Sequence, residues 1–245
     1  MKGFGPETYG DVIAGAYDGL YADAPENVVD RLAELAGGGP ALELGIGTGR
    51  VAVPLAARGV EVHGIDASVA MLEELRKKPG AAGIEATLGD FGEVETARRY
   101  RLVYVVFNTF FALTTQDEQL SCFTSVAERL EPGGVFLLEL FYPDLSRFDR
   151  GQTVRATSVA LDAVQLEVTT HDAVRQTITN QHVVLSGTGT RLYPVVLRYA
   201  WPSELDLMAR AAGLRLRGRW GDWDGAPFTS TDRRHISIYE RAKDH

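Results

Sequence analysis

The sequence predicts an α/β protein in which a mostly parallel sheet carries helices on both faces, together with a small antiparallel insertion. Between residues 41 and 141, short apolar segments alternate with segments of helical periodicity, an arrangement typical of a parallel sheet. The apolar character of these segments fits strands that are covered on both faces. Residues 152–200 instead alternate with a period of two, which indicates antiparallel strands.

Five apolar segments have the length of buried strands. Each is bounded by glycine, proline or polar residues that favour turns. In chain order, these strands are expected at residues 41–44, 60–65, 84–88, 102–107 and 135–141.

Helical periodicity accounts for the segments around these strands. Pro25 divides the first helical segment, and Thr115 with Glu118 forms a capping box at the start of a later one, because each side chain can satisfy the free backbone N–H of the other. Pro202 opens the last helix, as proline does at a first helical position. The expected helices cover residues 9–36, the residues from the glycine loop to about 58, 68–78, 115–130 and 202–212.

The period-two segment is expected to form three or four antiparallel strands. Val, Thr and Gln dominate it, as in the run TITNQHVV at residues 177–184, and Ser-Gly-Thr-Gly at 186–189 favours a turn. The chain therefore divides into one domain made of residues 1–151 and 201–245, and an insertion at 152–200. Two final strands, at about 214–220 and 235–240, are expected to form a terminal hairpin.

The segment LELGIGTGR, residues 42–50, contains the end of the first strand and concentrates glycines in the turn that follows it. A dinucleotide-binding G-x-G-x-x-G pattern that starts at Gly45 and Gly47 would need a third glycine where Arg50 stands, and the segment has no lysine for a P-loop. The remaining pattern is acidic-x-G-x-G-x-G, from Glu43 to Gly49. Glycine lacks a Cβ, so the backbone of this turn can lie directly against a ligand.

This pattern resembles motif I of the class I S-adenosylmethionine (SAM)-dependent methyltransferases. Later landmarks of that family follow in order: Asp66 ends the second strand, Asp90 and Phe91 follow the third, and Pro-Gly-Gly at 132–134 leads into the fifth. The resemblance implies a Rossmann-like, seven-stranded sheet, with the insertion over the active site. It also implies SAM as the methyl donor, S-adenosylhomocysteine as the product, and no metal.

Several residues are expected to bind the cofactor. In the family, a carboxylate at the position of Asp66 accepts hydrogen bonds from the ribose hydroxyls, and one at the position of Asp90 lies near the adenine amino group. The acidic residue at the position of Glu43 faces the methionine amino group, often through water. The expected cofactor-binding residues are Tyr17, Glu43, Gly45, Gly47, Gly49, Asp66, Ala67, Asp90, Phe91 and Phe107.

The segment YDGLY at residues 17–21 resembles the Y-D-x-x-Y of small-molecule methyltransferases, including those that methylate amino-deoxysugar nucleotides. It is expected to cover the site, although both tyrosines also fit an ordinary amphipathic helix. Enzymes that methylate amide or adenine nitrogens carry N/D-P-P-Y/F after the fourth strand, and this chain does not. The expected acceptor-binding residues are Tyr21, Asn108, Phe111 and Tyr142.

His182 is the candidate general base, although a histidine on a strand can also have a purely structural role. A base assists a hydroxyl acceptor, whereas a free amine needs none. His171 is a weaker candidate than His182, because it is expected to lie in a turn. The tryptophan-rich segment at residues 220–228 is expected either to form an aromatic acceptor wall or to cap the insertion.

The amino-acid composition limits the kinds of partner that the protein is expected to bind. A net charge of −8 disfavours nucleic acid, and the longest apolar run is far shorter than a membrane span. The single Cys122 excludes an internal disulfide and a cysteine-based zinc site. The first ten residues lack the apolar stretch of a signal peptide, which predicts a cytoplasmic protein. A monomer and a homodimer are both compatible with the sequence.

The predicted function is therefore SAM-dependent methylation of an O or N atom of a small-molecule acceptor such as a natural product or sugar. Two alternatives remain open at this stage. One is a SAM-binding protein of the same fold that catalyses another reaction. The other is an NAD(P)-dependent reductase, against which Arg50 argues because it replaces the third glycine of that fingerprint.

Overall fold

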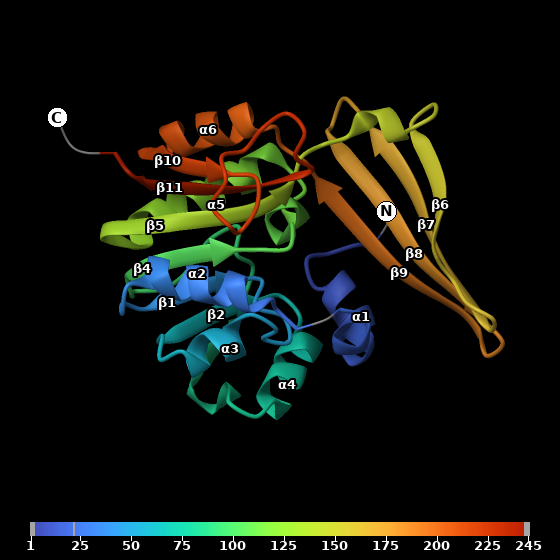
Figure 1. The fold of residues 1–245 in the computed structure, drawn as a ribbon, viewed down its shortest axis with the longest axis horizontal. Coiled ribbons are helices and arrows are strands. Elements are labelled where there is room, and N and C mark those ends of the chain that lie inside the picture. The colour runs from blue at the N-terminus through green and yellow to red at the C-terminus, as the bar shows by residue number, and fades with distance from the viewer. Residues whose placement is uncertain (1–2, 22, 243–245) are drawn as a thin grey trace.

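A seven-stranded sheet organises the chain in a computed structural model that describes residues 3–21 and 23–242 (Figure 1). We call it sheet A, and its strand order is β10-β11-β5-β4-β1-β2-β3. Its strands are β1 (Ala41–Leu44), β2 (Val62–Asp66), β3 (Glu85–Leu88), β4 (Tyr100–Val105), β5 (Leu130–Phe141), β10 (Leu214–Trp220) and β11 (Arg234–Arg241).

The first five strands are parallel, β11 runs antiparallel to them, and β10 pairs antiparallel with β11, so it runs in the same direction as the first five. The chain winds outward from β1 through β2 to β3, and then returns to place β4 on the other side of β1. A crevice opens at the carboxyl ends of strands where the winding reverses, and α/β proteins bind ligands there. The glycine loop after β1 lies at this point.

Helices cover both faces of sheet A, as predicted (Figure 1). On one face the buried residues of α2 (Glu26–Ala36), α3 (Ala52–Ala57) and α4 (Val69–Lys77) share a core with the sheet. On the other face α5 (Gln116–Arg129) and α6 (Pro202–Ala211) do the same. The capping box at Thr115 and Glu118 is present in both directions, which confirms that prediction.

Strand β5 begins earlier than the sequence predicts. Pro-Gly-Gly at residues 132–134 lies within the strand, where the pairing with β4 shifts register. A Cβ on Gly134 would lie 2.8 Å from the carbonyl oxygen of Tyr100. The glycine therefore permits a close approach of two backbones instead of ending the preceding helix alone.

The insertion forms a separate four-stranded antiparallel sheet, which we call sheet B. It joins sheet A through the short helix η3 (Leu145–Arg147) after β5 and returns directly to α6. In Figure 1 it projects beside the main body, beyond α1 (Thr8–Leu20), which packs against both α4 and β9. In spatial order its strands are β6 (Gln152–Val159), β7 (Ala163–Asp172), β8 (Thr177–Ser186) and β9 (Gly189–Arg198).

A buried ion pair anchors sheet B to the main body. Arg198, at the end of β9, donates to Glu204 on α6 and to the Gln119 side chain on α5, both at 2.7 Å. The Gln119 amide donates back to the Arg198 carbonyl oxygen at 2.8 Å. Arg198 is only 6% exposed, so removal of one partner leaves a charge without compensation in the interior.

Replacing Arg198 with alanine is expected to lower the free energy of unfolding by about 3 kcal/mol, because the half-buried Glu204 carboxylate would lose its charged partner and keep only the amides of Gln116 and Gln176. Urea unfolding monitored by circular dichroism measures this loss. Arg191, on the same strand but exposed, is the matched control, and its alanine variant is expected to stay within about 0.5 kcal/mol of the parent protein. Equal stability of the two variants would contradict the anchoring role.

Candidate active site

The glycine loop after β1 adopts a backbone that only glycine tolerates easily. Gly45, Gly47 and Gly49 have φ angles of +72°, +55° and +77°. A Cβ on Gly45 would lie 2.4 Å from the Cγ2 of Thr109, so the loop is closely packed against the turn after β4. Gly45 and Gly47 line a cavity of about 610 Å³ at the carboxyl edge of sheet A.

Gly49 has a packing role that differs from its predicted one. It does not line the cavity, and a Cβ there would lie 2.2 Å from a methyl group of Leu75 on α4. The third glycine of the motif therefore lets the loop pack against α4, rather than against a ligand.

Asp66, the last residue of β2, fixes the shape of the glycine loop. Its carboxylate accepts hydrogen bonds from the backbone N–H of Gly47 at 2.7 Å and of Ser68 at 2.9 Å. Burial raises the pKa of Asp66 even though both hydrogen bonds lower it. Asp66 and Ala67 both line the cavity, at the position predicted from the sequence.

The end of β3 supplies the next part of the cavity wall. Asp90 and Phe91 line the cavity, and the Asp90 carboxylate accepts a hydrogen bond from the N–H of Gly92 at 2.8 Å. Phe91 packs into the core of sheet A and is only 8% exposed. The two carboxylates, Asp66 and Asp90, thus come from neighbouring strand ends and face one cavity.

Glu43 lies in the core and does not line the cavity. Its carboxylate accepts a hydrogen bond at 2.9 Å from the Tyr104 hydroxyl on the neighbouring strand β4. Burial raises the pKa of Glu43 to about 8, against the effects of Tyr104 and of the positive charge of Arg50. The Glu43 carboxylate can therefore interact with the methionine portion of SAM only through intervening groups.

Glu43 is expected to make stability fall as the pH rises from about 5 to 8. In the unfolded chain its pKa is about 4.3, so the folded state binds the extra proton across this range, and that preference is lost as the pH passes the folded pKa of about 8. Urea unfolding at several pH values should show a flatter profile for Glu43→Gln than for the parent protein. Superimposable profiles would contradict the burial of an ionisable Glu43.

Helix α1 and the residue that follows it cover the cavity with three tyrosines. Tyr9, Tyr17 and Tyr21 line it together with Phe107. The Tyr9 and Tyr21 hydroxyls lie 3.2 Å apart, and the rings of Tyr17 and Tyr21 have centroids 4.7 Å apart. The sequence reasoning missed Tyr9, although its spacing of eight residues from Tyr17 places both on one face of a helix.

Burial keeps the phenols of Tyr9 and Tyr17 protonated. It raises the pKa of Tyr9 well above its usual value, and the neighbouring phenols add to the effect. It raises the pKa of Tyr17 to about 12, despite the opposing charge of Arg50. Tyr9 and Tyr17 can therefore donate and accept hydrogen bonds near neutral pH, but they cannot act as bases there.

Polar contacts hold α1 over the cavity. Asp18 accepts from the Thr48 hydroxyl at 2.7 Å and forms an ion pair with Lys78 at 2.7 Å. Asp11 accepts a hydrogen bond from the hydroxyl of Ser68, the N-cap of α4. A Cβ on Gly10 would lie 2.5 Å from the Cβ of Ser68, so the helices approach closely at that point.

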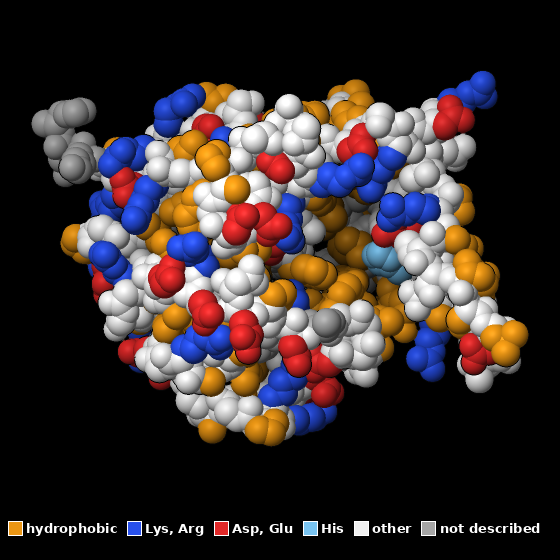
Figure 2. Space-filling model, viewed as in Figure 1, with side chains coloured by type: hydrophobic (Ala, Val, Ile, Leu, Met, Phe, Trp, Pro, Cys, Tyr) orange, Lys and Arg blue, Asp and Glu red, His pale blue; other side chains and the backbone are white. Residues whose placement is uncertain are grey.

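Sheet B closes the opposite side of the cavity. Figure 2 shows the hollow between the main body and this sheet, lined mostly by hydrophobic side chains. His182 lies on β8, and its Nδ1 is 3.9 Å from the carboxylate of Glu167 on β7. The lining residues from sheet B and η3 are Arg147, Glu167, Ile178, Asn180, His182, Val195, Val196 and Leu197.

The turn after β4 carries one predicted site residue into the cavity and one away from it. Asn108 lines the cavity with φ +67°, and its side-chain oxygen accepts from the Phe141 N–H at 2.6 Å. This conformation starts the short helix η2 (Thr109–Ala112), which turns Phe111 into the core, where it is fully buried. The predicted acceptor contact of Phe111 is therefore wrong.

Other predicted side chains also lie outside the cavity. Tyr142 is half-buried, packs against Trp201 and Phe228 and does not line the cavity, so its acceptor contact stays a prediction. His171 is structural, since its ring stacks on Phe148 and its Nε2 lies 3.0 Å from the Tyr199 hydroxyl.

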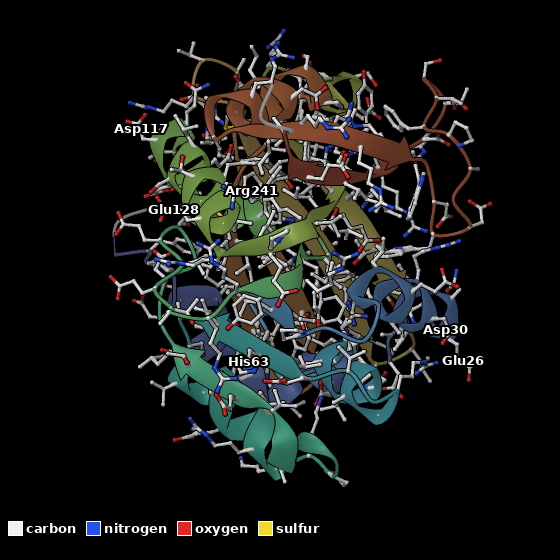
Figure 3. All side chains as sticks on the ribbon, turned by 90° about the vertical axis from the view of Figure 1, so that its left-hand side faces the viewer. Glu26, Asp30, His63, Asp117, Glu128 and Arg241 are labelled. Atoms are coloured by element: carbon white, nitrogen blue, oxygen red, sulfur yellow. The ribbon has the colours of Figure 1, made fainter. Side chains whose placement is uncertain are left out.

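The tryptophan-rich loop does not form an acceptor wall. Trp223 is buried and donates to Glu139 on β5 at 3.0 Å, and no residue from 220–228 lines the cavity. His63, labelled in Figure 3, lies on β2 and is paired with Glu61 at 2.9 Å, also outside the cavity.

Two further properties of the described chain bear on the site. Within residues 3–21 and 23–242, no group of three or more His, Cys, Asp or Glu side chains could hold a metal ion. None of the helices in those residues is long and apolar enough to span a membrane.

The residues present fit the adenosine and methionine portions of SAM. The bare backbone at Gly45 and Gly47 gives room for close contact, and Asp66 and Asp90 offer carboxylate oxygens from adjacent strand ends. Fold and cavity together define the class as an α/β protein that binds a nucleoside-containing cofactor at the winding reversal of its sheet.

Comparison with known proteins identifies the family. A methyltransferase-domain model matches residues 41–134. The cypemycin N-terminal methyltransferase of Streptomyces sp is 32% identical over 203 residues, which cover 82% of each chain. The solved structure of the CcbJ methyltransferase from Streptomyces caelestis superposes with a TM-score of 0.93 at 41% identity, covering 98% of this chain and 100% of the other.

A more distant likeness adds to the description of the fold. The SAM-bound amino pentose methyltransferase CalS10 from Micromonospora echinaspora superposes with a TM-score of 0.68 at 22% identity, over 88% of this chain and 89% of the other. The chain belongs to the SAM-dependent methyltransferases. It is therefore an enzyme, with SAM as its cofactor and a small molecule as its substrate.

Proposed function

We propose that this methyltransferase acts on an amine nitrogen of a small natural product or sugar. The observation that carries the proposal is the chemistry of the cavity next to the glycine loop. The lining side chains include the phenols of Tyr9, Tyr17 and Tyr21 and the ring of Phe107, and burial keeps Tyr9 and Tyr17 protonated. A neutral amine needs no base to act as a nucleophile, whereas a hydroxyl gains from one.

The name of a relative supports the same acceptor chemistry. The cypemycin N-terminal methyltransferase is named for an N-terminus, which is an amine, and it covers most of this chain. The similarity extends through sheet B, because 82% of the chain is matched.

We assign the cofactor-binding residues to two groups. Gly45, Gly47 and Ala67 would lie against the nucleoside and the methionine through their backbone, and Asp66 and Asp90 would accept hydrogen bonds from the ribose hydroxyls and the adenine amino group. Bound SAM supplies an activated methyl group, so the main task of the protein is to align the acceptor and exclude water. Helix α1 and sheet B close the cavity from two sides and serve this task.

The phenol pair is placed to orient the acceptor nitrogen. The Tyr9 and Tyr21 hydroxyls are 3.2 Å apart, so their oxygens can accept N–H groups from one amine and turn its lone pair toward the cofactor. Phe107 packs edge-on against Tyr21 with centroids 5.2 Å apart, which fixes the ring. Tyr21, Asn108 and Phe107 thus form the boundary between the cofactor and acceptor regions.

Sheet B, residues 152–200, would bind the body of the acceptor. Its apolar side chains, such as Val195, can cover a ring, and its polar side chains can bind hydroxyl groups. His182 beside Glu167 would bind such a group or hold the proton that a charged amine releases before transfer.

Replacing Tyr9 with phenylalanine is expected to lower kcat/KM for the amine acceptor about fivefold to tenfold, the effect of one lost hydrogen bond. The affinity for SAM should stay within about twofold, since Tyr9 contacts the acceptor side. Tyr100, buried at the start of β4 and outside the cavity, supplies the matched Tyr→Phe control with unchanged kinetics. An unaltered kcat/KM in Tyr9→Phe would argue against the orienting role.

A panel of paired acceptors tests the function. Each pair consists of an aminodeoxy sugar or an aminoacyl compound and its hydroxyl congener, incubated with SAM and the full chain and analysed by mass spectrometry. Methylation is expected on the amine of a pair and not on its hydroxyl congener. Preferential methylation of hydroxyl congeners would overturn the assignment to nitrogen.

A further inference from the structure

The turn after β4 holds two successive non-glycine residues in the left-handed backbone conformation. Phe107 has a φ of +58° and Asn108 has a φ of +67°. Asparagine adopts this conformation more readily than most residues, whereas for a bulky residue such as phenylalanine it is an outlier. Such a conformation costs free energy and persists only where the surrounding structure enforces it. The turn therefore needs support from a neighbouring element.

Strand β5 supplies this support through Glu139. The Phe107 N–H donates to the Glu139 carboxylate at 3.0 Å, and the Asn108 N–H donates to the Glu139 carbonyl oxygen at 3.1 Å. Two residues further along β5, the Phe141 N–H donates to the Asn108 side chain at 2.6 Å. Glu139 thus accepts a hydrogen bond from each residue of left-handed conformation. Its bond to Phe107 is the stronger kind, because the acceptor is a carboxylate.

The tryptophan-rich loop holds the Glu139 carboxylate in place. The carboxylate oxygen that does not bind Phe107 accepts from the Trp223 indole N–H at 3.0 Å. The same oxygen lies 3.4 Å from a guanidinium nitrogen of Arg234, which pairs with Asp222 of the loop at 2.7 Å. Trp223 is buried. Each oxygen of the carboxylate therefore has its own donor, and the side chain cannot turn without losing one of them.

The ring of Phe107 carries the effect of this turn into the site. The ring lines the cavity and the residue is 42% exposed, so packing alone holds it weakly. It contacts two side chains at the site: the Tyr21 ring, with centroids 5.2 Å apart, and the Arg50 guanidinium, 4.6 Å from its own centroid. The position of the ring therefore depends on its backbone, and the backbone depends on Glu139.

We infer that Glu139 is a positioning residue for methyl transfer, because it holds Phe107 in the conformation that keeps Tyr21 and the acceptor in line with the cofactor. The inference rests on the proposed placement of the acceptor beside Tyr21 and Phe107. Glu139 does not line the cavity, so it acts through the turn and not by contact with a reactant. The tryptophan-rich loop then supports the site from outside the cavity, by fixing the Glu139 carboxylate.

Fluorine NMR of the full chain, with para-fluorophenylalanine incorporated at position 107, tests the inference without an acceptor. With S-adenosylhomocysteine added, the parent protein is expected to give one narrow signal. Glu139→Ala should shift and broaden this signal, because the Phe107 N–H loses its acceptor. Glu139→Gln keeps the size of the side chain and guards against misfolding of the alanine variant. Its single oxygen cannot accept from both Phe107 and Trp223, so a smaller shift is expected.

Glu240 is the matched control for Glu139. It is a half-buried carboxylate of the same sheet, it pairs with Arg215, and it lies at the far end of β11 from the residue that faces Glu139. Glu240→Ala should leave the fluorine signal of position 107 unchanged. Circular dichroism spectra show whether each variant is folded.

Kinetic measurements connect the turn to the reaction, with the acceptor that the paired panel shows to be methylated. Glu139→Ala is expected to lower kcat about tenfold or more through misalignment, while the Kd for S-adenosylhomocysteine stays within about threefold of the parent value. In a Phe107→Ala background the same change should have little further effect on kcat, because the ring through which Glu139 acts is absent.

An unshifted fluorine signal in both Glu139 variants would overturn the inference. So would a loss of kcat that is as large in the Phe107→Ala background as in the parent protein. A parent-like kcat in Phe107→Ala alone would overturn the proposed acceptor placement and the inference with it. These outcomes hold whether the methylated atom is nitrogen or oxygen, so failure of the inference is distinguishable from failure of the assignment to nitrogen.

Discussion

Replacing Asp66 with alanine is expected to weaken SAM binding by about 1–3 kcal/mol, a factor of about 5 to 150 in Kd. The variant would lose the proposed charged acceptor of the ribose hydroxyls. It would also leave the N–H groups of Gly47 and Ser68 without their present partner, so the glycine loop would lose part of its support. Isothermal titration calorimetry with SAM and with S-adenosylhomocysteine measures both constants.

The matched control for Asp66 is Glu73, an exposed carboxylate on the following helix α4. Its alanine variant changes the net charge by the same amount and is expected to bind SAM with the parent affinity. If Asp66→Ala bound SAM as tightly as Glu73→Ala does, the nucleoside would have to lie away from the end of β2.

Gly45→Val is expected to raise the Kd for SAM more than about 100-fold, or about 2.7 kcal/mol. The φ of +72° is a conformation that β-branched residues rarely adopt. The added Cβ would also lie 2.4 Å from the Cγ2 of Thr109. The loop must move to relieve both conflicts, and the backbone surface next to the cavity moves with it.

Gly187→Val is the control for the effect of replacing a glycine with a β-branched residue. It lies in the turn between β8 and β9, and a Cβ there would meet no atom within 4 Å. Gly187→Val should bind SAM as the parent protein does. The account of the glycine loop fails if Gly45→Val, folded by its circular dichroism spectrum, retains the parent affinity.

The strand-end residues of the cavity could be predicted because a parallel sheet brings them to one edge. Asp66 and Asp90 follow apolar strands in the sequence, and parallel strands place their carboxyl ends together. The glycines were found by the same logic, although the packing of Gly49 against Leu75 depends on the position of α4. The sequence around Gly49 does not determine where α4 lies.

The errors arose where a side chain's direction depends on a single dihedral angle or on a distant strand. The positive φ of Asn108 begins the turn that takes Phe111 into the core. The burial of Glu43 depends on the Tyr104 hydroxyl from another strand. The approach of Glu167 to His182 follows from the register of β7 and β8, which alternation alone does not determine.

A crystal structure with bound S-adenosylhomocysteine tests the central claim most directly. The account predicts the ribose beside Asp66, the adenine beside Asp90 and Phe91, and the sulfur facing the cavity between the α1 tyrosines and sheet B. A second cavity of about 690 Å³ shares Asp90 but extends along β3 toward Glu95 and Ser121. A nucleoside found in that cavity, with no contact to the glycine loop, would contradict the account.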